Sequence, residues 1–243
     1  MNNRHKYESF ERYEFKYLLK NKQRYQIESD ISNFMKLDNF ALEKKGYFVR
    51  SLYFDDDQST EYYNKTDGML IRKKFRLRTY SKYLNNNVPI YMEIKGRNNQ
   101  RTFKNRTKID YNDLALYEQC ELENLIKKKD VINIEFLFQI FRRSIKPKIV
   151  TDYWRSPYIS NDDGNFRLTF DNQNTIKKTD KLFNNQADYR RSVLPGYSIL
   201  EIKFDRRIPK WFHRIIQNYN LNRMSISKFC MGMEKADIAI NLE

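Results

Sequence analysis

The sequence predicts an α+β fold in which about eight antiparallel strands close into a β-barrel, with helices packed on its outside. Three observations support this prediction. Many short segments alternate between apolar and polar residues, the polar face of these segments repeatedly carries Lys and Arg, and the region from residue 111 to 143 has apolar residues at helical spacing. Closing such a sheet creates a cationic tunnel and leaves the apolar faces outside for helices to cover.

The clearest of these segments is Ile71–Tyr80, which reads I-R-K-K-F-R-L-R-T-Y. In a β-strand, alternate side chains point to opposite faces. One face therefore carries the cations Arg72, Lys74, Arg76 and Arg78. A row of like charges is unfavourable unless an anion lies among them. The row is either the wet outer face of an antiparallel sheet or one wall of an anion-binding tunnel. Similar rows on other strands favour the tunnel.

The remaining elements are assigned by the same periodicities. Strands are predicted at Phe10–Lys20, Gly46–Asp55, Val88–Lys95, Gln100–Asp110, Lys146–Ile159, Phe166–Asp171 and Gly196–Asp205. Helices are predicted from Asn21 to about Leu37, at Trp211–Tyr219 and at Ile226–Lys235. Asp56–Lys65 is predicted as a short helix or turn, Gly96–Asn99 as a turn, and Asn172–Val193 as irregular with one short strand.

Tyr111–Arg143 is the most helical part of the chain. One apolar stripe consists of Leu114, Tyr117, Leu122, Leu125 and Ile126. A second stripe consists of Ile134, Leu137, Phe138 and Phe141. We expect both stripes to cover the sheet.

Composition limits the class of protein. The chain has 243 residues, 40% of them hydrophobic, without a Pro-, Gly- or Ser-rich linker, which predicts one domain over residues 1–243. The net charge of +15 predicts a polyanionic partner: a nucleic acid, an anionic membrane surface, or a phosphate-rich molecule or polymer. Two cysteines are too few for a disulfide framework or a zinc site.

Location is predicted from what the sequence lacks. No apolar run approaches the roughly 20 residues of a membrane span, and the first residues lack the apolar region of a signal peptide. We expect a cytoplasmic protein that can dock peripherally at a membrane. There is also no Walker A loop and no G-x-G-x-x-G, so we expect side chains to hold any phosphate.

Seven segments, in order, resemble one family. They are R-Y-E-F-K-Y-L-L, S-L-Y-F-D, K-F-R-L-R-T-Y, Y-M-E-I-K-G, R-L-T-F-D, I-L-E-I-K-F and S-I-S-K-F. Together they are similar to the VTC domain, the polyphosphate polymerase module of the triphosphate tunnel metalloenzyme (CYTH-like) superfamily. The resemblance runs from about Phe10 to Lys235 and implies that superfamily's tunnel.

The resemblance also implies roles for single residues. The catalytic set would be Lys16, Arg76, Arg78, Lys95, Arg155 and Arg167. Further phosphate contacts would come from Lys104, Arg106, Tyr153, Ser227 and Lys228, to which the cation rows add Lys203. Glu201 matches the carboxylate that holds a divalent metal, Mn²⁺ or Mg²⁺, with Glu14 and Glu93 as further candidates. Arg binds phosphate through planar bidentate contacts, Lys supplies a movable charge, and Mg²⁺ often uses one or two protein carboxylates beside substrate phosphates.

Two positions depart from the patterns of this superfamily. Its hydrolases begin with E-x-E-x-K, whereas this chain has Arg12-Tyr13-Glu14-Phe15-Lys16. Losing the first carboxylate removes a metal ligand or water-orienting base, which favours transfer to phosphate over hydrolysis. Eukaryotic relatives also tend to have Lys-x-Ser-Lys near the end, where this chain has Ser225-Ile226-Ser227-Lys228 and therefore one cation fewer.

The function implied is a polyphosphate polymerase that uses ATP and inorganic polyphosphate. A tripolyphosphatase or nucleoside triphosphatase of the same fold is the first alternative, and a non-catalytic module that binds polyphosphate or nucleic acid is the second. No specific nucleic acid is expected as partner. Eukaryotic relatives carry membrane-spanning regions, so we expect any coupling to translocation here to need a membrane-protein partner.

Overall fold

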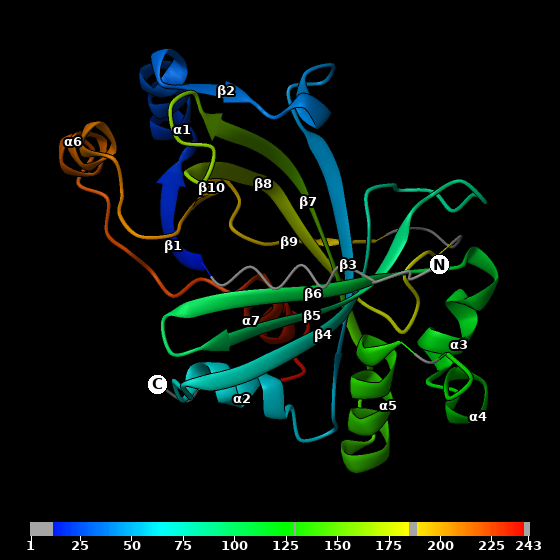
Figure 1. Cartoon of the computed structure of the whole chain (residues 1–243). Helices are drawn as coiled ribbons and strands as arrows, with labels where there is room; N and C mark the ends of the chain where they lie inside the picture. The colour runs from blue at the N-terminus through cyan, green and yellow to red at the C-terminus, as the bar shows by residue number, and fades with distance from the viewer. Residues whose placement is uncertain (1–11, 129, 185–188, 241–243) are drawn as a thin grey trace.

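The barrel is seen in a computed structural model that describes residues 12–128, 130–184 and 189–240. The start of the first predicted strand at Phe10 lies outside these residues. Eight strands pair in the closed order β7-β3-β4-β5-β6-β1-β10-β8, and β8 pairs back with β7. All of these pairings are antiparallel. The predicted α+β fold with a closed antiparallel barrel is confirmed (Figure 1).

The eight barrel strands lie close to their predicted positions. They are β1 (Arg12–Lys20), β3 (Tyr47–Asp55), β4 (Ile71–Thr79), β5 (Ile90–Asn98), β6 (Arg101–Ile109), β7 (Lys146–Ser160), β8 (Arg167–Lys178) and β10 (Tyr197–Phe204). Two short strands, β2 (Met35–Leu37) and β9 (Arg191–Ser192), pair with β7 and β8 respectively.

Helices pack around this barrel (Figure 1). They are α1 (Asn21–Asp30), α2 (Thr60–Thr66), α3 (Leu114–Gln119), α4 (Leu122–Leu125), α5 (Val131–Arg143), α6 (Lys210–Asn218) and α7 (Lys228–Lys235). None of the described helices is long and apolar enough to cross a membrane.

Strand alternation places the apolar face outside and the cations inside. On β4, Phe75 and Leu77 are buried in an outer core together with Phe136 of α5. A second outer core joins β1, β8 and β10 to α1 and α6 through residues such as Leu168 and Phe212. The cations of Ile71–Tyr80 therefore line the barrel interior, and the alternative of a wet outer face does not hold for them.

Helix α7 packs against the inner face of the barrel at one end. Ile149 has the same parity on β7 as the lumen residues Tyr153 and Arg155, and it belongs to a third core with Phe229 and Met233 of α7. Gly232 makes this approach possible: a Cβ at this position would lie 2.5 Å from Ile149 Cδ1. In Figure 1, α7 lies behind β4, β5 and β6. This end of the barrel is therefore partly filled by protein.

The helix predicted from Asn21 to Leu37 is shorter than expected. Lys20 is its N-cap residue, and helix α1 ends at Asp30. Met35–Leu37 instead forms β2, with Met35 buried and Lys36 exposed, and pairs with the end of β7. The prediction failed because the apolar spacing around Met35 also fits a helical stripe.

Strand β8 is longer than predicted. It continues past Asp171 to Lys178, through a β-bulge opposite Tyr153 where Gln173 has φ +51°. The bulge adds a residue to β8 and breaks the period of two that a strand should show. Strand β5 also runs past its predicted end, through Gly96 to Asn98, and Gly96 is not a turn residue. The ring of Phe103 on β6 covers the position where a Cβ would stand, which explains the glycine.

The outward face of α5 was predicted incorrectly. Ile134, Phe138 and Phe141 are 55%, 52% and 80% exposed, whereas Ile132 and Phe136 are buried against the sheet. Apolar residues lie on both faces of this helix, so their spacing did not identify the buried one. The prediction for α3 was better, since Leu114 and Tyr117 are buried in the outer core.

Candidate functional site

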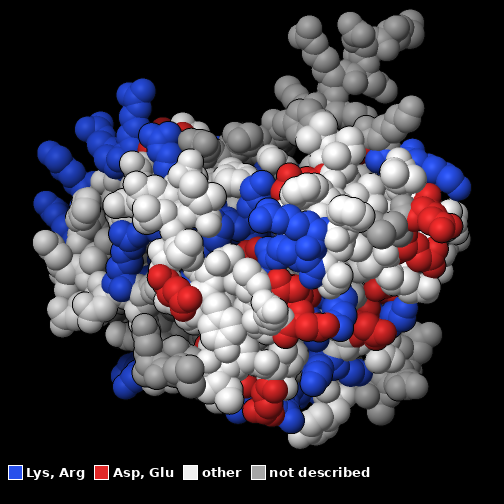
Figure 2. Space-filling view, turned by 90° about the horizontal axis from the view of Figure 1, so that it is seen from below, with Lys and Arg blue, Asp and Glu red and all other residues white. Residues whose placement is uncertain are grey.

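The barrel interior contains a cavity of about 670 Å³ with a cationic wall. Every residue in the predicted site lines this cavity except Glu93. The wall also includes Arg12, Tyr53 and Lys74. Figure 2 shows Lys and Arg side chains gathered near the centre of one face of the molecule, with Asp and Glu side chains beside them. The site is therefore a mixture of charges with cations in excess.

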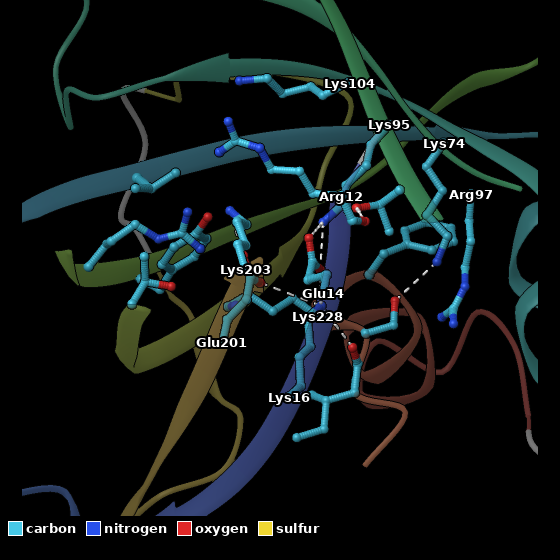
Figure 3. Close-up of a pocket in the computed structure, with 18 of the residues that line it drawn as sticks. Arg12, Glu14, Lys16, Lys74, Lys95, Arg97, Lys104, Glu201, Lys203 and Lys228 are labelled. Carbon is cyan, nitrogen blue, oxygen red and sulfur yellow. Dashed lines mark hydrogen bonds and ion pairs between the residues drawn. The ribbon is translucent and has the colours of Figure 1, made fainter. Parts of the chain in front are cut away.

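Two carboxylates hold three lysines at the centre of the site (Figure 3). Both Glu14 oxygens accept from Lys95 Nζ at 2.9 Å, and Lys16 Nζ lies 3.2 Å from Glu14 Oε1. Glu201 Oε1 lies 2.8 Å from Lys203 Nζ, and its Oε2 lies 3.7 Å from Lys16 Nζ. Lys16 thus bridges the two carboxylates.

Strand pairing builds this cluster. Glu14 and Lys16 face inward on β1, and the antiparallel register puts Glu14 across from Lys203 and Lys16 across from Glu201 on β10. Opposite charges directly across a sheet stabilise the pairing. The cluster is therefore fixed by two rigid strands.

Burial and charge set the ionisation of these groups. Burial and Glu201 raise the pKa of Glu14, but Lys95, Lys16 and Lys203 outweigh them and lower it to about 2. Burial also raises the pKa of Glu201, and the surrounding lysines hold it well below its usual range. Burial lowers the pKa of Lys95 to about 8 despite the opposing effect of Glu14. Both carboxylates are charged at neutral pH, and Lys95 titrates just above it.

The arginines of β4 form a second layer. Arg76 donates from Nε and Nη2 to Glu93 Oε2 at 3.0 and 2.7 Å, and from Nη1 to Tyr53 Oη at 2.9 Å. Arg78 donates to Ser51 Oγ at 3.1 Å and to Tyr153 Oη at 3.2 Å. Both guanidinium groups are buried and held at several points, so their planes are fixed.

Glu93 supports these arginines from behind the cavity wall. It is fully buried on β5, and its Oε2 also lies 3.7 Å from Arg78 Nη1. Burial raises the pKa of Glu93, but Arg78 and Arg76 outweigh it and lower it to about 2. This carboxylate points inward on β5 and holds two arginines in place, but it does not itself line the cavity.

A third cluster centres on Asp171 of β8. Arg155 donates to both oxygens of Asp171 at 2.7 Å, and Lys228 Nζ donates to Oδ2 at 2.6 Å. Burial raises the pKa of Asp171, but Arg155 and Lys228 lower it to about 2. Lys228 Nζ also lies 4.5 Å from the ring centroid of Tyr153. Asp171 thus fixes Arg155 and Lys228 against the cavity.

The N-terminal end of α7 closes around the site. Ser227 caps the helix by accepting from Cys230 N at 3.3 Å, and Lys74 Nζ donates to Ser227 Oγ at 3.0 Å. Lys16 Nζ donates to the carbonyl of Ile226 at 3.1 Å. Lumen cations on β1 and β4 therefore anchor the last helix.

Other lumen cations are held less tightly. Lys104 of β6 has no hydrogen bond or ion pair with any residue that the structure describes, and burial lowers its pKa to about 8. Arg106 stacks on Tyr91, with Cζ 4.7 Å from the ring centroid, and Arg167 donates to the carbonyl of Gly164 at 3.4 Å. Arg12 lines the cavity and its Nε lies 3.2 Å from Asp205 Oδ1.

Two participants in the site were not predicted from sequence. Tyr53 accepts from Arg76, and Asp171 holds two site cations. Lys74, one of the predicted row of cations, contacts Ser227. Burial raises the pKa of Tyr53, but Arg76 and Arg78 outweigh it and lower it to about 7. Strand parity was a usable signal for Asp171, which shares its face of β8 with the predicted site residue Arg167.

The carboxylates differ in how well they fit a metal. Glu14 and Glu201 both line the cavity, and repulsion by Glu201 raises the pKa of Glu14, an effect that a divalent cation held by both carboxylates would relieve. Glu93 does not fit, because two arginines occupy its surroundings. The described residues contain no group of three or more His, Cys, Asp or Glu that could hold a metal. Glu14 and Glu201 are thus two protein ligands at most, and a Mn²⁺ or Mg²⁺ ion held by them would take its remaining ligands from phosphate oxygens.

This arrangement is suited to an extended chain of phosphates. Arginines with fixed planes lie on β4 and β7, movable lysines lie on β1, β5, β6 and β10, and all face one enclosed space. A low-dielectric interior strengthens the interaction of these cations with a polyanion. Its arginines and lysines can supply charge neutralisation and positioning, and no histidine is among the described residues that line it.

Comparisons with known proteins agree with the fold. The family model of the VTC domain matches residues 11–236. No curated protein sequence matches the chain. Among solved structures, a protein described as a candidate adenylate cyclase from Bacillus halodurans has a TM-score of 0.50 at 10% sequence identity, covering 89% of this chain and 94% of that chain. A protein from Pyrococcus horikoshii has a TM-score of 0.48 at 12% identity, covering 92% of this chain and 99% of that chain.

Proposed function

The chain belongs to the VTC domain family and has a triphosphate tunnel fold, and we propose that it is a metal-dependent polyphosphate polymerase. In this proposal the γ-phosphoryl group of ATP is transferred to the end of a polyphosphate chain inside the barrel. The observation that carries the proposal is the cavity inside the closed barrel, in which fixed arginines and movable lysines from seven strands converge.

The arginines would hold the phosphates that react. Arg76 and Arg78 already have fixed planes, because Glu93, Tyr53, Ser51 and Tyr153 hold them. Preorganised donors stabilise the charge of a phosphoryl-transfer transition state without reorganising during the reaction. Arg155, held by Asp171, would act in the same way from β7, which is separated from β4 by β3 alone.

The lysines would follow the chain as it moves. Lys95 and Lys104 titrate near pH 8 when no phosphate is present, and a bound polyanion would favour their charged forms. Lys16 and Lys203 are held by Glu14 and Glu201. A divalent cation at these two carboxylates would neutralise charge that develops on the transferred phosphoryl group.

The transfer itself needs no general base. The terminal phosphate of the growing chain is mostly ionised near pH 7, since its last pKa is about 6. One of its oxygens attacks the γ-phosphorus, the bond from that phosphorus to the β,γ-bridging oxygen breaks, and ADP leaves with the electron pair. Arg12 lines the cavity at the position where the hydrolases of the superfamily have their first carboxylate. A cation at this position favours transfer to phosphate over activation of water.

The experiment that tests the proposal is incubation of the pure protein with ATP and Mn²⁺, followed by separation of the products. Long acid-labile phosphate chains with stoichiometric ADP are expected. ADP with free phosphate and no chains would favour a tripolyphosphatase or nucleoside triphosphatase, and tight binding of RNA or DNA without turnover would favour a binding module.

A pair of variants separates the defined site from general basicity. Arg76→Ala should reduce turnover by at least about 100-fold, which is the typical effect of removing one preorganised charge donor. Lys128→Ala is the matched control, because Lys128 pairs with Asp113 at the helical outer surface. Equal losses from both variants would contradict a defined tunnel site.

A further inference from the structure

Three tyrosines form a row at one end of the barrel. Tyr47 begins β3, Tyr80 directly follows β4, and Tyr91 is the second residue of β5. The ring centroids of Tyr47 and Tyr80 are 5.7 Å apart, and those of Tyr80 and Tyr91 are 6.3 Å apart. Because β3, β4 and β5 are neighbours in the sheet, the three rings contact one another edge to face and form an aromatic strip.

The strip faces the lumen. Tyr47 and Tyr80 line the cavity, and Tyr91 has the same parity on β5 as Glu93 and Lys95. All three side chains are only half-buried, so part of each ring remains accessible. They do not belong to the buried members of the three apolar cores.

The strip lies directly beside the cations of the phosphate site. Tyr91 is the register partner of Arg78, and Tyr47 is the register partner of Arg155. Arg106 stacks on the Tyr91 ring. Side chains two residues apart on one strand face are about 7 Å apart, so the strip begins one side chain outward from Arg78 and Glu93.

The opposite end of the barrel has a different character. A second cavity of about 590 Å³ lies there, lined by Lys65, Arg72 and Arg97. It shares seven wall residues with the main cavity, including Ser225, Ile226 and Ser227. No Phe, Tyr or Trp is among the described residues that line it. One end therefore has aromatic rings beside its cations, and the second cavity at the other end has cations without aromatic rings.

We propose that the strip formed by Tyr47, Tyr80 and Tyr91 binds the aromatic base of the nucleoside triphosphate, with the triphosphate directed inward to Arg78. This inference rests on the proposed function and adds to it the residues that recognise the base and the end from which the nucleotide enters. The cationic end formed by Lys65, Arg72 and Arg97 is then left for phosphate without a base.

The chemistry of the strip fits a base better than another phosphate. Burial raises the pKa of Tyr47 to about 12, so its ring is neutral over the physiological range. Stacking of a base on an aromatic side chain contributes about 1–3 kcal/mol and tolerates different bases. The site would therefore favour nucleoside triphosphates over bare tripolyphosphate without selecting strongly among bases.

The test compares ATP with tripolyphosphate as ligands of Tyr80→Ala, by calorimetry on the intact protein. Losing a stacking interaction of this size should weaken ATP binding by about 5- to 150-fold. Tripolyphosphate has no base, so its dissociation constant should change less than about twofold. Tyr80→Phe keeps the ring and should bind ATP nearly as the wild type does.

Tyr83→Ala is the matched control, because Tyr83 lies in the same loop and is 79% exposed. An equal loss of ATP and tripolyphosphate binding by Tyr80→Ala, at an unchanged unfolding temperature, would overturn the proposal. Unchanged ATP binding by both Tyr80→Ala and Tyr91→Ala would also overturn it. The test measures binding and does not depend on turnover. If the protein made no polyphosphate, the proposed function would be refuted, but the comparison of ATP with tripolyphosphate binding would still test the role of the strip.

Discussion

Glu93→Gln is the substitution whose effect the structure defines best. Glu93 is fully buried, and its Oε2 accepts two hydrogen bonds from Arg76 while lying 3.7 Å from Arg78 Nη1. The variant keeps the size of the side chain and removes its charge. Two buried guanidinium groups, 6% and 7% exposed, then lose their common anion.

The magnitude follows from the cost of an uncompensated buried charge. Removing one partner of a buried ion pair costs about 3–5 kcal/mol. Tyr53 Oη still accepts from Arg76, so we expect the lower part of this range, about 3 kcal/mol. For a protein of this size, each 1 kcal/mol lowers the melting temperature by roughly 2–4 °C, which gives a fall of about 6–12 °C.

Denaturant unfolding of Glu93→Gln measures this loss, and Glu135→Gln is the control. Glu135 pairs with Lys73 on the surface, where the side chains are 31% and 39% exposed, and an exposed pair contributes about 1 kcal/mol or less. Tripolyphosphate should stabilise Glu93→Gln more than the wild type, because the bound anion replaces the missing carboxylate. A Glu93→Gln protein within about 1 kcal/mol of the wild type would refute the assignment of Glu93 as the support of both arginines.

Two further predictions concern the lumen charges. The affinity for tripolyphosphate should fall between pH 7 and 9, because Lys95 and Lys104 lose their protons at a pKa of about 8. Calorimetry should show a smaller fall in affinity for Lys104→Met than for the wild type. Equal pH profiles of the two proteins would contradict a role for Lys104. The unliganded protein should in contrast gain stability above pH 8, because the unfolded state then binds more protons than the folded state. Glu201→Gln should weaken Mn²⁺ binding in the presence of tripolyphosphate by about tenfold or more, because one of the two carboxylates is lost. Titration with the metal measures this change. Unchanged binding would exclude Glu201 as a ligand.

Strand parity explains why much of the site could be predicted from the sequence. Once Ile71–Tyr80 is a strand, Phe75 and Leu77 require Arg76 and Arg78 to face the other way, and the same holds for Glu14 and Lys16. No knowledge of the third dimension is needed for this step. The closing of the sheet then brings those faces together.

Prediction from the sequence failed where the spacing of apolar residues fits more than one arrangement, and where a bulge interrupts the alternation of a strand. Helix α5 has apolar residues on both faces, and its buried face includes Asn133, which accepts from Tyr117 Oη at 2.9 Å. A polar residue in this position is satisfied only by a partner that tertiary packing supplies. On β8, the bulge at Gln173 shifts the alternation, and the strand beyond Asp171 was therefore predicted as irregular.

Tyr53 was missed for a related reason. Strand β3 is buried on both faces, with Leu52 and Phe54 in the outer core and Tyr53 packed on Phe229 of α7. A strand with apolar residues on both faces gives no sign of which side is the lumen. Its role depends on α7, which lies more than 170 residues further along the chain.

The lysines of the lumen are shared between two competing sets of anions. In the unliganded protein, Glu14 and Glu201 hold Lys16, Lys95 and Lys203. Phosphate that recruits these lysines leaves the two carboxylates with less positive charge around them, and a divalent cation that binds the carboxylates releases the lysines to phosphate. Substrate and metal should therefore strengthen each other's binding, and thermodynamic linkage requires the same factor in both directions. The internal ion pairs of the barrel would thus couple the two ligands without any movement of its strands.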